Sequence, residues 1–348
     1  MQFSQIIGND ELKAVLTRMV DSDRLPHAIL LTEDGDWGGI AFATALAQYV
    51  NCEHPHDGDS CGECNSCHKY SKLIHPDQHY VFPVAATKEL TESEKKTPIS
   101  DYFIGNFRRL LLADSYFSEQ TMYEVLGLEN KSGNISVHEA KRIFEKLSLT
   151  ASEGRSKTII IYLPEKMNQE AANKLLKLLE EPPLGTLFIL VSHAPDKILS
   201  TIRSRCQRIQ LKPLSTEEHR RAGLSSQTNP EFRELLTGII KAGLDKRLID
   251  TFPIWESLAE MGREKQRDWC LYSEKFIRNI YLTSLSMQTV ADTDPAEEAI
   301  ITELASKIKP DFYEKAFRAL ESAIGSVEGN VNAKLTFCNL CNIMYSYL

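Results

Sequence analysis

The chain has 348 residues, of which 42% are hydrophobic and 25% charged, and its formal net charge is −8. This length is too great for one small core and predicts two or three domains. The longest apolar runs, such as 159–161, are far too short to span a membrane, and the first thirty residues lack the apolar stretch of a signal peptide. We therefore expect a cytoplasmic protein with no membrane contact. The acidic balance argues against DNA binding as the main task, because a stand-alone DNA binder usually carries a basic stripe or a high pI.

Short apolar strands alternate with helical patterns over the first two-thirds of the chain. Apolar runs without alternation, which are typical of strands buried on both faces, occur at 29–31, 158–163 and 187–191, and an edge strand is expected at 209–211. Between the second and third runs, Asn168 can cap an amphipathic helix that ends at Pro182. This alternation predicts an α/β domain with a parallel sheet and right-handed crossovers.

Two segments interrupt the alternation, and the character of the chain changes after Pro213. The first is a cysteine-rich module at about residues 50–75. The second, at about residues 85–133, mixes a charged stretch with a more apolar one, and we interpret it as an insertion whose structure and role the sequence leaves open. Beyond Pro213 amphipathic helical patterns dominate to the end, which predicts an all-helical C-terminal part.

Four of the eight cysteines cluster with the spacing Cys52-x8-Cys61-x2-Cys64-x2-Cys67. Four thiolates so close together suit a tetrahedral zinc ion, and a site filled by four protein ligands is structural rather than catalytic. The alternatives are free or redox-active thiols and an iron–sulfur cluster, which also takes four cysteines. We expect structural Zn²⁺, because three evenly spaced cysteines with a fourth nearby are rare by chance.

A second cysteine pair, Cys338-x2-Cys341, has a different setting. It lies on an apolar helical stripe with no further ligand close by in sequence. Two small buried hydrophobic side chains are the expected interpretation.

A glycine-bearing loop follows the first strand, where a phosphate-binding loop of the form GxxxxGK[ST] would lie. In such a loop the lysine reaches the β- and γ-phosphates, and the hydroxyl holds Mg²⁺. Here Gly39, after Gly38, stands at the lysine position, and Ile40 stands at the hydroxyl position. The first glycine is replaced by Glu33, whose charge repels phosphate. The alternative is that this loop is simply a glycine-containing turn.

The second half of a nucleotide site has lost its charged groups as well. A Walker B strand ends in a metal-binding Asp and usually a Glu, but residues 159–165 read IIIYLPE. Tyr162 and Leu163 stand at those two positions, and Glu165 lies too far along to replace them. Because phosphoryl transfer depends on positioning and electrostatic stabilisation, we expect no ATP in this site and no hydrolysis there.

Further motifs carry a resemblance that decides between these interpretations. They are Phe3-x2-Ile6-Ile7-Gly8-Asn9, Arg24-Leu-Pro-His-Ala28, Ala47-Gln-Tyr-x-Asn-Cys52, His75-Pro-Asp77, the helix sequence AANKLLKLLEEPP at 171–183, SRC at 204–206 and NVNAKL at 330–335. Together they resemble the bacterial DNA polymerase III clamp-loader family over residues 3–210 and again near the C-terminus. The resemblance implies an AAA+-type (RecA-like) domain. Lost Walker chemistry with a retained SRC motif is similar to the delta-prime branch of that family.

The SRC motif comprises Ser204, Arg205 and Cys206. In the family, its arginine reaches across a subunit interface to the γ-phosphate of ATP held by a neighbour. The resemblance therefore implies that Arg205 is a trans-acting arginine finger, a role that suits a planar and permanently charged guanidinium. The alternative is an ordinary solvated basic edge, which is what we expect of the flanking Arg203 and Arg208.

The resemblance implies three parts. These are an AAA+-like domain at 1–212, a small helical lid at 213–245 and a helical collar for oligomerisation at 246–348. It also implies a non-catalytic subunit that acts as a stator for gamma/tau and delta subunits and meets the sliding clamp and primed DNA through the complex. Two alternatives remain open: an active ATPase of the same fold, and a zinc-dependent nucleic-acid-binding protein outside clamp loading.

Overall fold

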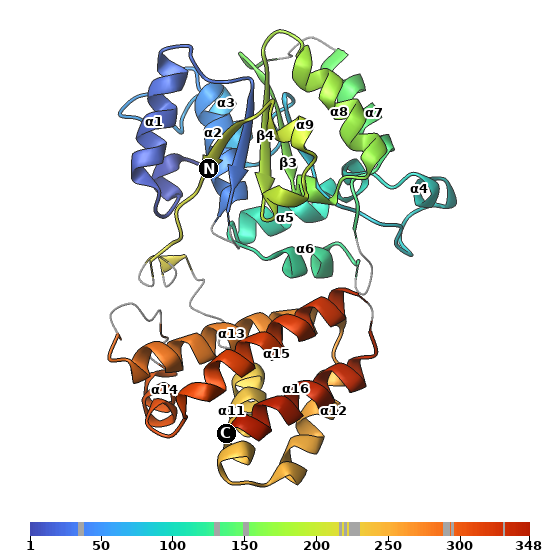
Figure 1. Cartoon of the computed structure of the whole chain (residues 1–348). Helices are drawn as coiled ribbons and strands as arrows, with labels where there is room; N and C mark the ends of the chain where they lie inside the picture. Colours follow the sequence, from blue (N-terminus) through green and yellow to red (C-terminus); the bar gives the residue numbers. More distant parts are fainter. Residues whose placement is uncertain are drawn as a thin grey trace. The chain divides into compact units, whose positions relative to one another are not determined.

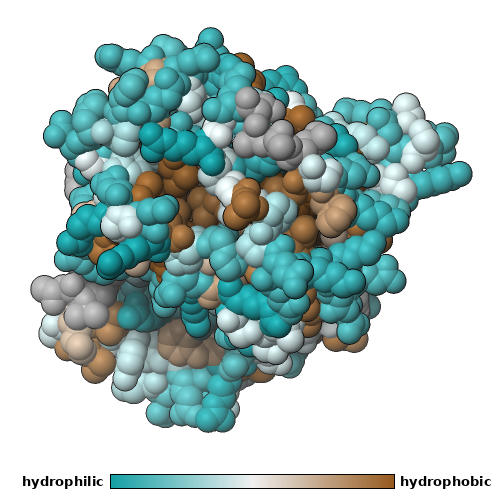
Figure 2. Space-filling model, turned by 90° about the horizontal axis from the view of Figure 1, so that it is seen from above, coloured by the Kyte–Doolittle hydropathy of each residue, from teal (hydrophilic) through white to brown (hydrophobic). Residues whose placement is uncertain are grey.

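The computed structural model describes residues 1–33, 38–128, 133–148, 153–215, 218, 221–222, 230–287, 293, 296–329 and 331–348. It divides into two compact units, Met1–Leu224 and Ser225–Leu348 (Figure 1). On the face drawn in Figure 2, hydrophilic residues surround a smaller area of hydrophobic ones. Within the described ranges, no helix is both long enough and apolar enough to cross a bilayer.

The first unit is built on one five-stranded sheet. Its strands are β1 (Ala28–Thr32), β2 (Gln78–Val81), β3 (Lys157–Tyr162), β4 (Thr186–Ser192) and β5 (Gln207–Gln210). Their order is β2-β3-β4-β1-β5, and every neighbouring pair is parallel. The predicted parallel sheet is thus confirmed, with β5 at one edge. The other edge strand, β2, was not singled out from the sequence because it is short and has no clear pattern.

Helices cover both faces of this sheet (Figure 1). They are α1 (Asp10–Asp21), α2 (Gly39–Val50), α3 (Asn65–Ser71), α4 (Glu92–Lys96), α5 (Ile104–Ala113), α6 (Glu119–Val125), α7 (Val137–Ser148), α8 (Gln169–Glu180) and α9 (Ser200–Arg203). The N-terminus of α8 is capped as expected, since the Asn168 side chain accepts a hydrogen bond from the Ala171 N–H at 2.8 Å.

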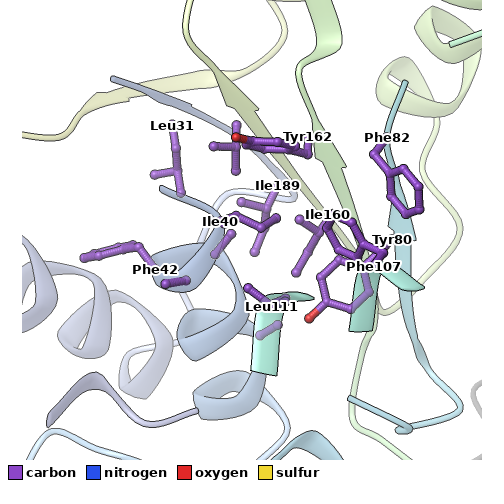
Figure 3. Packing of buried hydrophobic residues seen from close by; sticks show 14 of the residues in the cluster. Leu31, Ile40, Phe42, Tyr80, Phe82, Phe107, Leu111, Ile160, Tyr162 and Ile189 are labelled. Atoms are coloured by element: carbon purple, nitrogen blue, oxygen red, sulfur yellow. The ribbon is translucent and has the colours of Figure 1, made fainter. Parts of the chain in front are cut away.

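The two faces of the sheet bury two separate cores, and this explains why its strands are apolar without alternation. Along β1, Ile29 and Leu31 pack in the core shared with α2, whereas Ala28 and Leu30 pack in the core shared with α8. Successive side chains of a strand point to opposite faces, so a strand covered on both sides must be apolar at every position. Figure 3 shows the first of these cores, to which the sheet, α2 and α5 all contribute.

The inserted segment is part of the first core and not a separate appendage. Phe107 on α5 stacks on Phe82 with ring centroids 4.2 Å apart, and it also contacts Tyr80 at 5.4 Å. Earlier in the segment, the backbone N–H of Ser100 donates to the buried Glu139 carboxylate on α7 at 2.8 Å. The segment is therefore fixed to the sheet by aromatic packing and to α7 by a buried hydrogen bond.

The second unit is all-helical in its described residues. Its helices are α11 (Pro230–Leu244), α12 (Phe252–Glu260), α13 (Arg263–Ser284), α14 (Glu298–Ala305), α15 (Pro310–Glu328) and α16 (Ala333–Tyr347). They enclose a core that includes Trp269, Phe312 and Phe337. Of the pair expected to be buried, Cys341 is buried in the same core, whereas Cys338 is only half-buried.

The expected lid at 213–245 lies partly in the second unit and partly outside the described residues. Its last helix, α11, packs into the core of the second unit through Leu236, Ile239 and Ile240. Most of residues 216–229 lie outside the described residues. The three-part division at 212 and 245 therefore stays a prediction.

Replacing Phe107 by alanine should show that the inserted segment contributes to the stability of the first unit. The ring is fully buried and contacts three other aromatic rings. We expect Phe107→Ala to lower the free energy of unfolding by about 3–5 kcal/mol, measured by chemical denaturation. Leu112→Ala is the matched control, because that side chain on the same helix is 53% exposed. Equal, small effects of both variants would contradict this packing.

Candidate functional site

The candidate nucleotide site comprises Gly38, Gly39 and Ile40 at the start of α2 with Tyr162 and Leu163 at the end of β3. Residues 34–37 of its loop lie outside the described residues. Gly38 is the N-cap residue of α2 and has φ +86°, in the left-handed region that favours glycine. The helix that follows is buried from its first residue through Tyr49, so its N-terminal N–H groups point into the protein and need acceptors.

Glu33 supplies one of these acceptors. The residue is 4% exposed. Its carboxylate accepts a hydrogen bond from the Gly39 N–H at 2.9 Å and lies 3.1 Å from Nε2 of His193. Both side chains come from adjacent strand ends, because the parallel pairing of β1 with β4 places Thr32 opposite Ser192. A negative charge at a helix N-terminus is stabilised by the helix dipole. Glu33, which we expected from the sequence to repel phosphate, thus places its own carboxylate at the N-terminus of α2.

The Walker B positions carry apolar and aromatic surface instead of carboxylates. Tyr162 is 2% exposed, and its ring contacts Phe117 and His193 at centroid distances of 5.8 Å and 5.5 Å. Leu163 is fully buried and has φ +56°. Glu165 accepts from the backbone N–H of His193 at 2.9 Å, so its carboxylate fixes the loop after β4. These contacts favour packing over the binding of a metal ion.

Sequence reasoning missed two residues at this site, Tyr116 and His193. Tyr116 belongs to the inserted segment, is 7% exposed, and accepts a hydrogen bond from the Ile7 N–H at 2.8 Å. Its ring lies so close to Gly38 that a Cβ added there would be 2.3 Å from a ring carbon. His193 was detectable from its place after a buried strand, but nothing local in the sequence indicated the position of Tyr116.

The four predicted metal ligands come together in one cluster. The Sγ atoms of Cys52, Cys61, Cys64 and Cys67 all lie within 4.8 Å of one another. Three of the separations are 3.5 Å, 3.6 Å and 3.9 Å. A tetrahedron with Zn–S bonds of about 2.3 Å has sulfur–sulfur edges of about 3.8 Å. The cluster is therefore able to hold one metal ion.

Backbone N–H groups already stabilise negative charge on these sulfurs. Cys61, Cys64 and Cys67 each donate their N–H to the Sγ of another cluster cysteine, at 3.2–3.4 Å. Burial alone raises the pKa of the Cys61 thiol, but the N–H groups of Cys64 and Glu63 bring it down to about 6. Burial raises the pKa of the Cys52 and Cys67 thiols. A cation offsets that cost, because thiolates are the metal-binding form.

The cysteine module also holds the N-terminal segment of the chain. Asp59 accepts hydrogen bonds from the backbone N–H groups of Phe3 and Ser4, both at 2.9 Å. The Gln2 side-chain amide donates to the Ser60 carbonyl at 2.6 Å. Any ordering of this module by a metal therefore extends to the first residues of the chain, which precede α1.

Arg205 lies just after α9, next to the end of α8. Its guanidinium forms an ion pair with the carboxylate of Glu180 and donates to the Thr201 carbonyl at 2.9 Å. The side chain remains 35% exposed.

The neighbouring residue Cys206 packs in the core with α8, and burial raises the pKa of its thiol to about 11. Arg203 pairs instead with Asp196 at 3.0 Å. Two motifs of the resemblance, the helix at 171–183 and SRC, thus meet at the Arg205–Glu180 ion pair.

Comparison with known proteins gives matches over the same part of the chain. A family model described as "DNA polymerase III, delta subunit" matches residues 8–215. The chain is 26% identical over 250 residues to the DNA polymerase III subunit delta' of Haemophilus influenzae, covering 72% of this chain and 62% of that protein. It is 27% identical over 187 residues to the subunit delta' of Escherichia coli K12, covering 54% of this chain and 42% of that protein. The aligned part thus spans about half the length of these relatives.

Solved structures show a fainter likeness. A DNA polymerase III gamma subunit-related protein from Thermotoga maritima aligns over 96% of this chain and 99% of its own, with a TM-score of 0.43 and 16% sequence identity.

The sheet order, its helices and the matched span define an AAA+-type clamp-loader domain that carries a four-cysteine module. The chain belongs to the delta-prime family of DNA polymerase III subunits.

Gly38→Ala tests the close packing at the candidate nucleotide site. A side chain there meets both the Tyr116 ring and an unfavourable positive φ. We expect a loss of about 2 kcal/mol or more in the free energy of unfolding, measured by chemical denaturation. Gly105→Ala is the control, because that glycine lies in α5 with open space around its Cβ position and should gain up to about 1 kcal/mol. A neutral Gly38→Ala variant would show that Tyr116 does not pack there.

Proposed function

We propose that this chain is a non-catalytic, delta-prime subunit of the DNA polymerase III clamp loader, working in the cytoplasm. It acts as a stator against which ATP-bearing gamma/tau subunits close, together with a delta subunit, while the sliding clamp is loaded onto primed DNA. In this role it binds no ATP at its own site and donates Arg205 to the ATP site of a neighbouring subunit. Its three parts are the AAA+-like domain, the lid at 213–245 and the collar at 246–348.

The single observation that carries the proposal is the contrast between two charged groups in one domain. At the candidate nucleotide site the buried acceptor is the anion Glu33, which disfavours a phosphate in the same position. At the SRC motif the cation Arg205 is about one-third exposed and is held in place by Glu180. A domain that binds and hydrolyses its own ATP needs a positive charge at this loop, with a lysine and a hydroxyl where Gly39 and Ile40 stand.

The geometry around Arg205 suits a residue that acts outside its own chain. A guanidinium is planar and remains charged, and it can bind phosphate oxygens through two parallel hydrogen bonds. The ion pair with Glu180 and the bond to the Thr201 carbonyl use part of its five donors and fix its direction. An exposed ion pair contributes little to stability, so exchanging Glu180 for a phosphate has a small cost to the fold.

We further propose that the four-cysteine cluster holds a structural Zn²⁺. The four ligands fill a tetrahedron, which leaves no position for substrate, and zinc bound this way stabilises the fold around it. The module's hydrogen bonds to the backbone of Phe3 and Ser4 support a structural task.

Reconstitution with gamma/tau and delta subunits tests the role of Arg205. We expect Arg205→Ala to leave assembly intact and to lower DNA-stimulated ATP turnover by about threefold or more. A finger contributes roughly 10³–10⁵ in rate at the one site it reaches, while other sites continue to turn over. Arg205→Lys should recover little, because an ammonium lacks the planar fork.

Arg208→Ala is the matched control, because Arg208 is an exposed arginine on β5 of the same motif region. It should leave turnover unchanged. Turnover at the wild-type level in an intact Arg205→Ala assembly removes Arg205 from its proposed role.

Metal analysis of the purified chain tests the zinc site. We expect about one zinc per chain by elemental mass spectrometry, and loss of that zinc with a lower melting temperature in Cys64→Ser, because one of the four thiolates is missing. Cys338→Ser is the control, since this half-buried thiol on α16 lies outside the cluster. Iron with acid-labile sulfide in place of zinc would assign the cluster to iron–sulfur chemistry instead.

A further inference from the structure

The inserted segment reaches the candidate nucleotide site at the turn between α5 and α6. Three contacts anchor it around this turn. Phe107 stacks on Phe82 before the turn, and Glu119 after it forms an ion pair at 2.6 Å with Lys166, which follows β3. Further back, the Ser100 N–H donates to the buried Glu139 carboxylate. The turn is therefore held in place from both sides.

Tyr116, in this turn, contacts two segments that border the site, the N-terminal motif and the start of α2. Its hydroxyl accepts from the Ile7 N–H in the N-terminal motif, while its ring lies against Gly38 at the start of α2. The tyrosine is 7% exposed, so the space between Ile7 and Gly38 is filled by its ring.

Phe117 extends the same packing to the Walker B side. It is 2% exposed and meets Tyr162 edge-on with ring centroids 5.8 Å apart, and it meets Phe107 at 5.9 Å. A row of aromatic rings thus runs from α5 across the turn to the end of β3. The two consecutive residues Tyr116 and Phe117 cover the loop side and the strand side of the candidate nucleotide site.

Glu33 adds a charged group to this arrangement. Its buried carboxylate accepts the Gly39 N–H and faces His193. A helix N-terminus preceded by a glycine-rich loop is a place where phosphate binds in other proteins, because its N–H groups and dipole favour an anion. Here the chain provides that anion itself, from Glu33 directly after β1.

We propose that the inserted segment is a built-in plug that closes the candidate nucleotide site, with Tyr116 filling the space beside Gly38 and the Glu33 carboxylate taking the phosphate position. The proposal rests on the assignment of this loop as a former nucleotide site, which is part of the proposed function. It assigns a task to residues 100–126 and adds a steric reason for the missing nucleotide to the loss of charged groups.

The plug excludes ligands in two ways that can be tested separately, by the charge of Glu33 and by the ring of Tyr116. Removing the Glu33 carboxylate opens a position for an anion, while Tyr116 still excludes anything larger. Removing both opens the site to a nucleotide. The backbone amides at the start of α2 report on both, because residues 38–42 include the N–H that Glu33 accepts.

Hydrogen–deuterium exchange of the peptide at 38–42 in the full chain measures these effects. The variants are Glu33→Ala, Glu33→Ala/Tyr116→Ala, and Glu33→Ala/Tyr116→Phe, which keeps the ring and loses only the hydroxyl. Each is measured alone, with inorganic phosphate and with Mg-ADP. Circular dichroism establishes that each variant is folded.

We expect phosphate to slow exchange roughly fivefold in Glu33→Ala and to leave the wild type unchanged. ADP should give similar protection only in Glu33→Ala/Tyr116→Ala, and not in the variant that keeps a phenylalanine ring. If phosphate protects the wild type equally, or fails to protect Glu33→Ala, the anion half of the proposal is wrong. If ADP protects Glu33→Ala with Tyr116 in place, or fails to protect the Tyr116→Ala double variant, the steric half is wrong.

A Glu33→Ala/Tyr116→Ala chain that does not fold is replaced by Glu33→Ala/Tyr116→Leu, which retains apolar volume but is shorter than the ring. These outcomes do not depend on Arg205. An unchanged ATP turnover in Arg205→Ala assemblies would remove the arginine finger and leave the plug standing, whereas an exchange result against the plug leaves the turnover prediction intact.

Discussion

The hydrogen bond from the Gly39 N–H to the Glu33 carboxylate is the interaction around which the first unit is arranged. The N-terminus of α2 is buried, and a buried helix end needs acceptors for its N–H groups and favours a negative charge. From the end of β1, Glu33 supplies the negative charge and accepts one of these N–H groups, and His193 contacts the same carboxylate from the end of β4. Since β1 and β4 are neighbouring interior strands, the two cores of the sheet fix the position of this charge.

Once an internal anion occupies this position, the surroundings can be apolar. Tyr162 and Leu163 are buried where an ATPase places carboxylates for its metal ion, and Phe117 packs on Tyr162. An apolar wall raises the cost of bringing in a triphosphate and its Mg²⁺, because charges lose their hydration there. The ion pair of Arg205 with Glu180, by contrast, lies at the solvent-accessible surface, with side chains 35% and 46% exposed.

The cysteine module and the inserted segment both bind the N-terminal residues of the chain. Asp59 of the module binds the backbone of Phe3 and Ser4, and Tyr116 of the inserted segment binds that of Ile7. The stretch before α1 is thus held by two elements that are far away in sequence. This arrangement explains how a short irregular segment keeps a defined course beside the candidate nucleotide site.

Short sequence patterns were enough to identify the buried strands, the capped helix at Asn168, the set of four cysteines and the absence of a lysine and hydroxyl from the loop. These features depend on residue type and short spacing, and the physical rules that govern them are local. The motif at 204–206 also identified Arg205 as a candidate, through resemblance. The role of the inserted segment was left open, because its mixed composition fits several structures.

The contacts between residues far apart in sequence became evident in the folded chain. Glu33 and His193 are 160 positions apart, and Tyr116 reaches Ile7 across 109. Such pairs depend on strand order, register and the path of a connecting segment, none of which short-range patterns encode. The same holds for Arg205 and Glu180, whose contact follows from the packing of α8 beside α9. Short-range patterns thus identified the nucleotide-binding side chains that the loop lacks, and the folded chain showed that Glu33 and Tyr116 lie beside it.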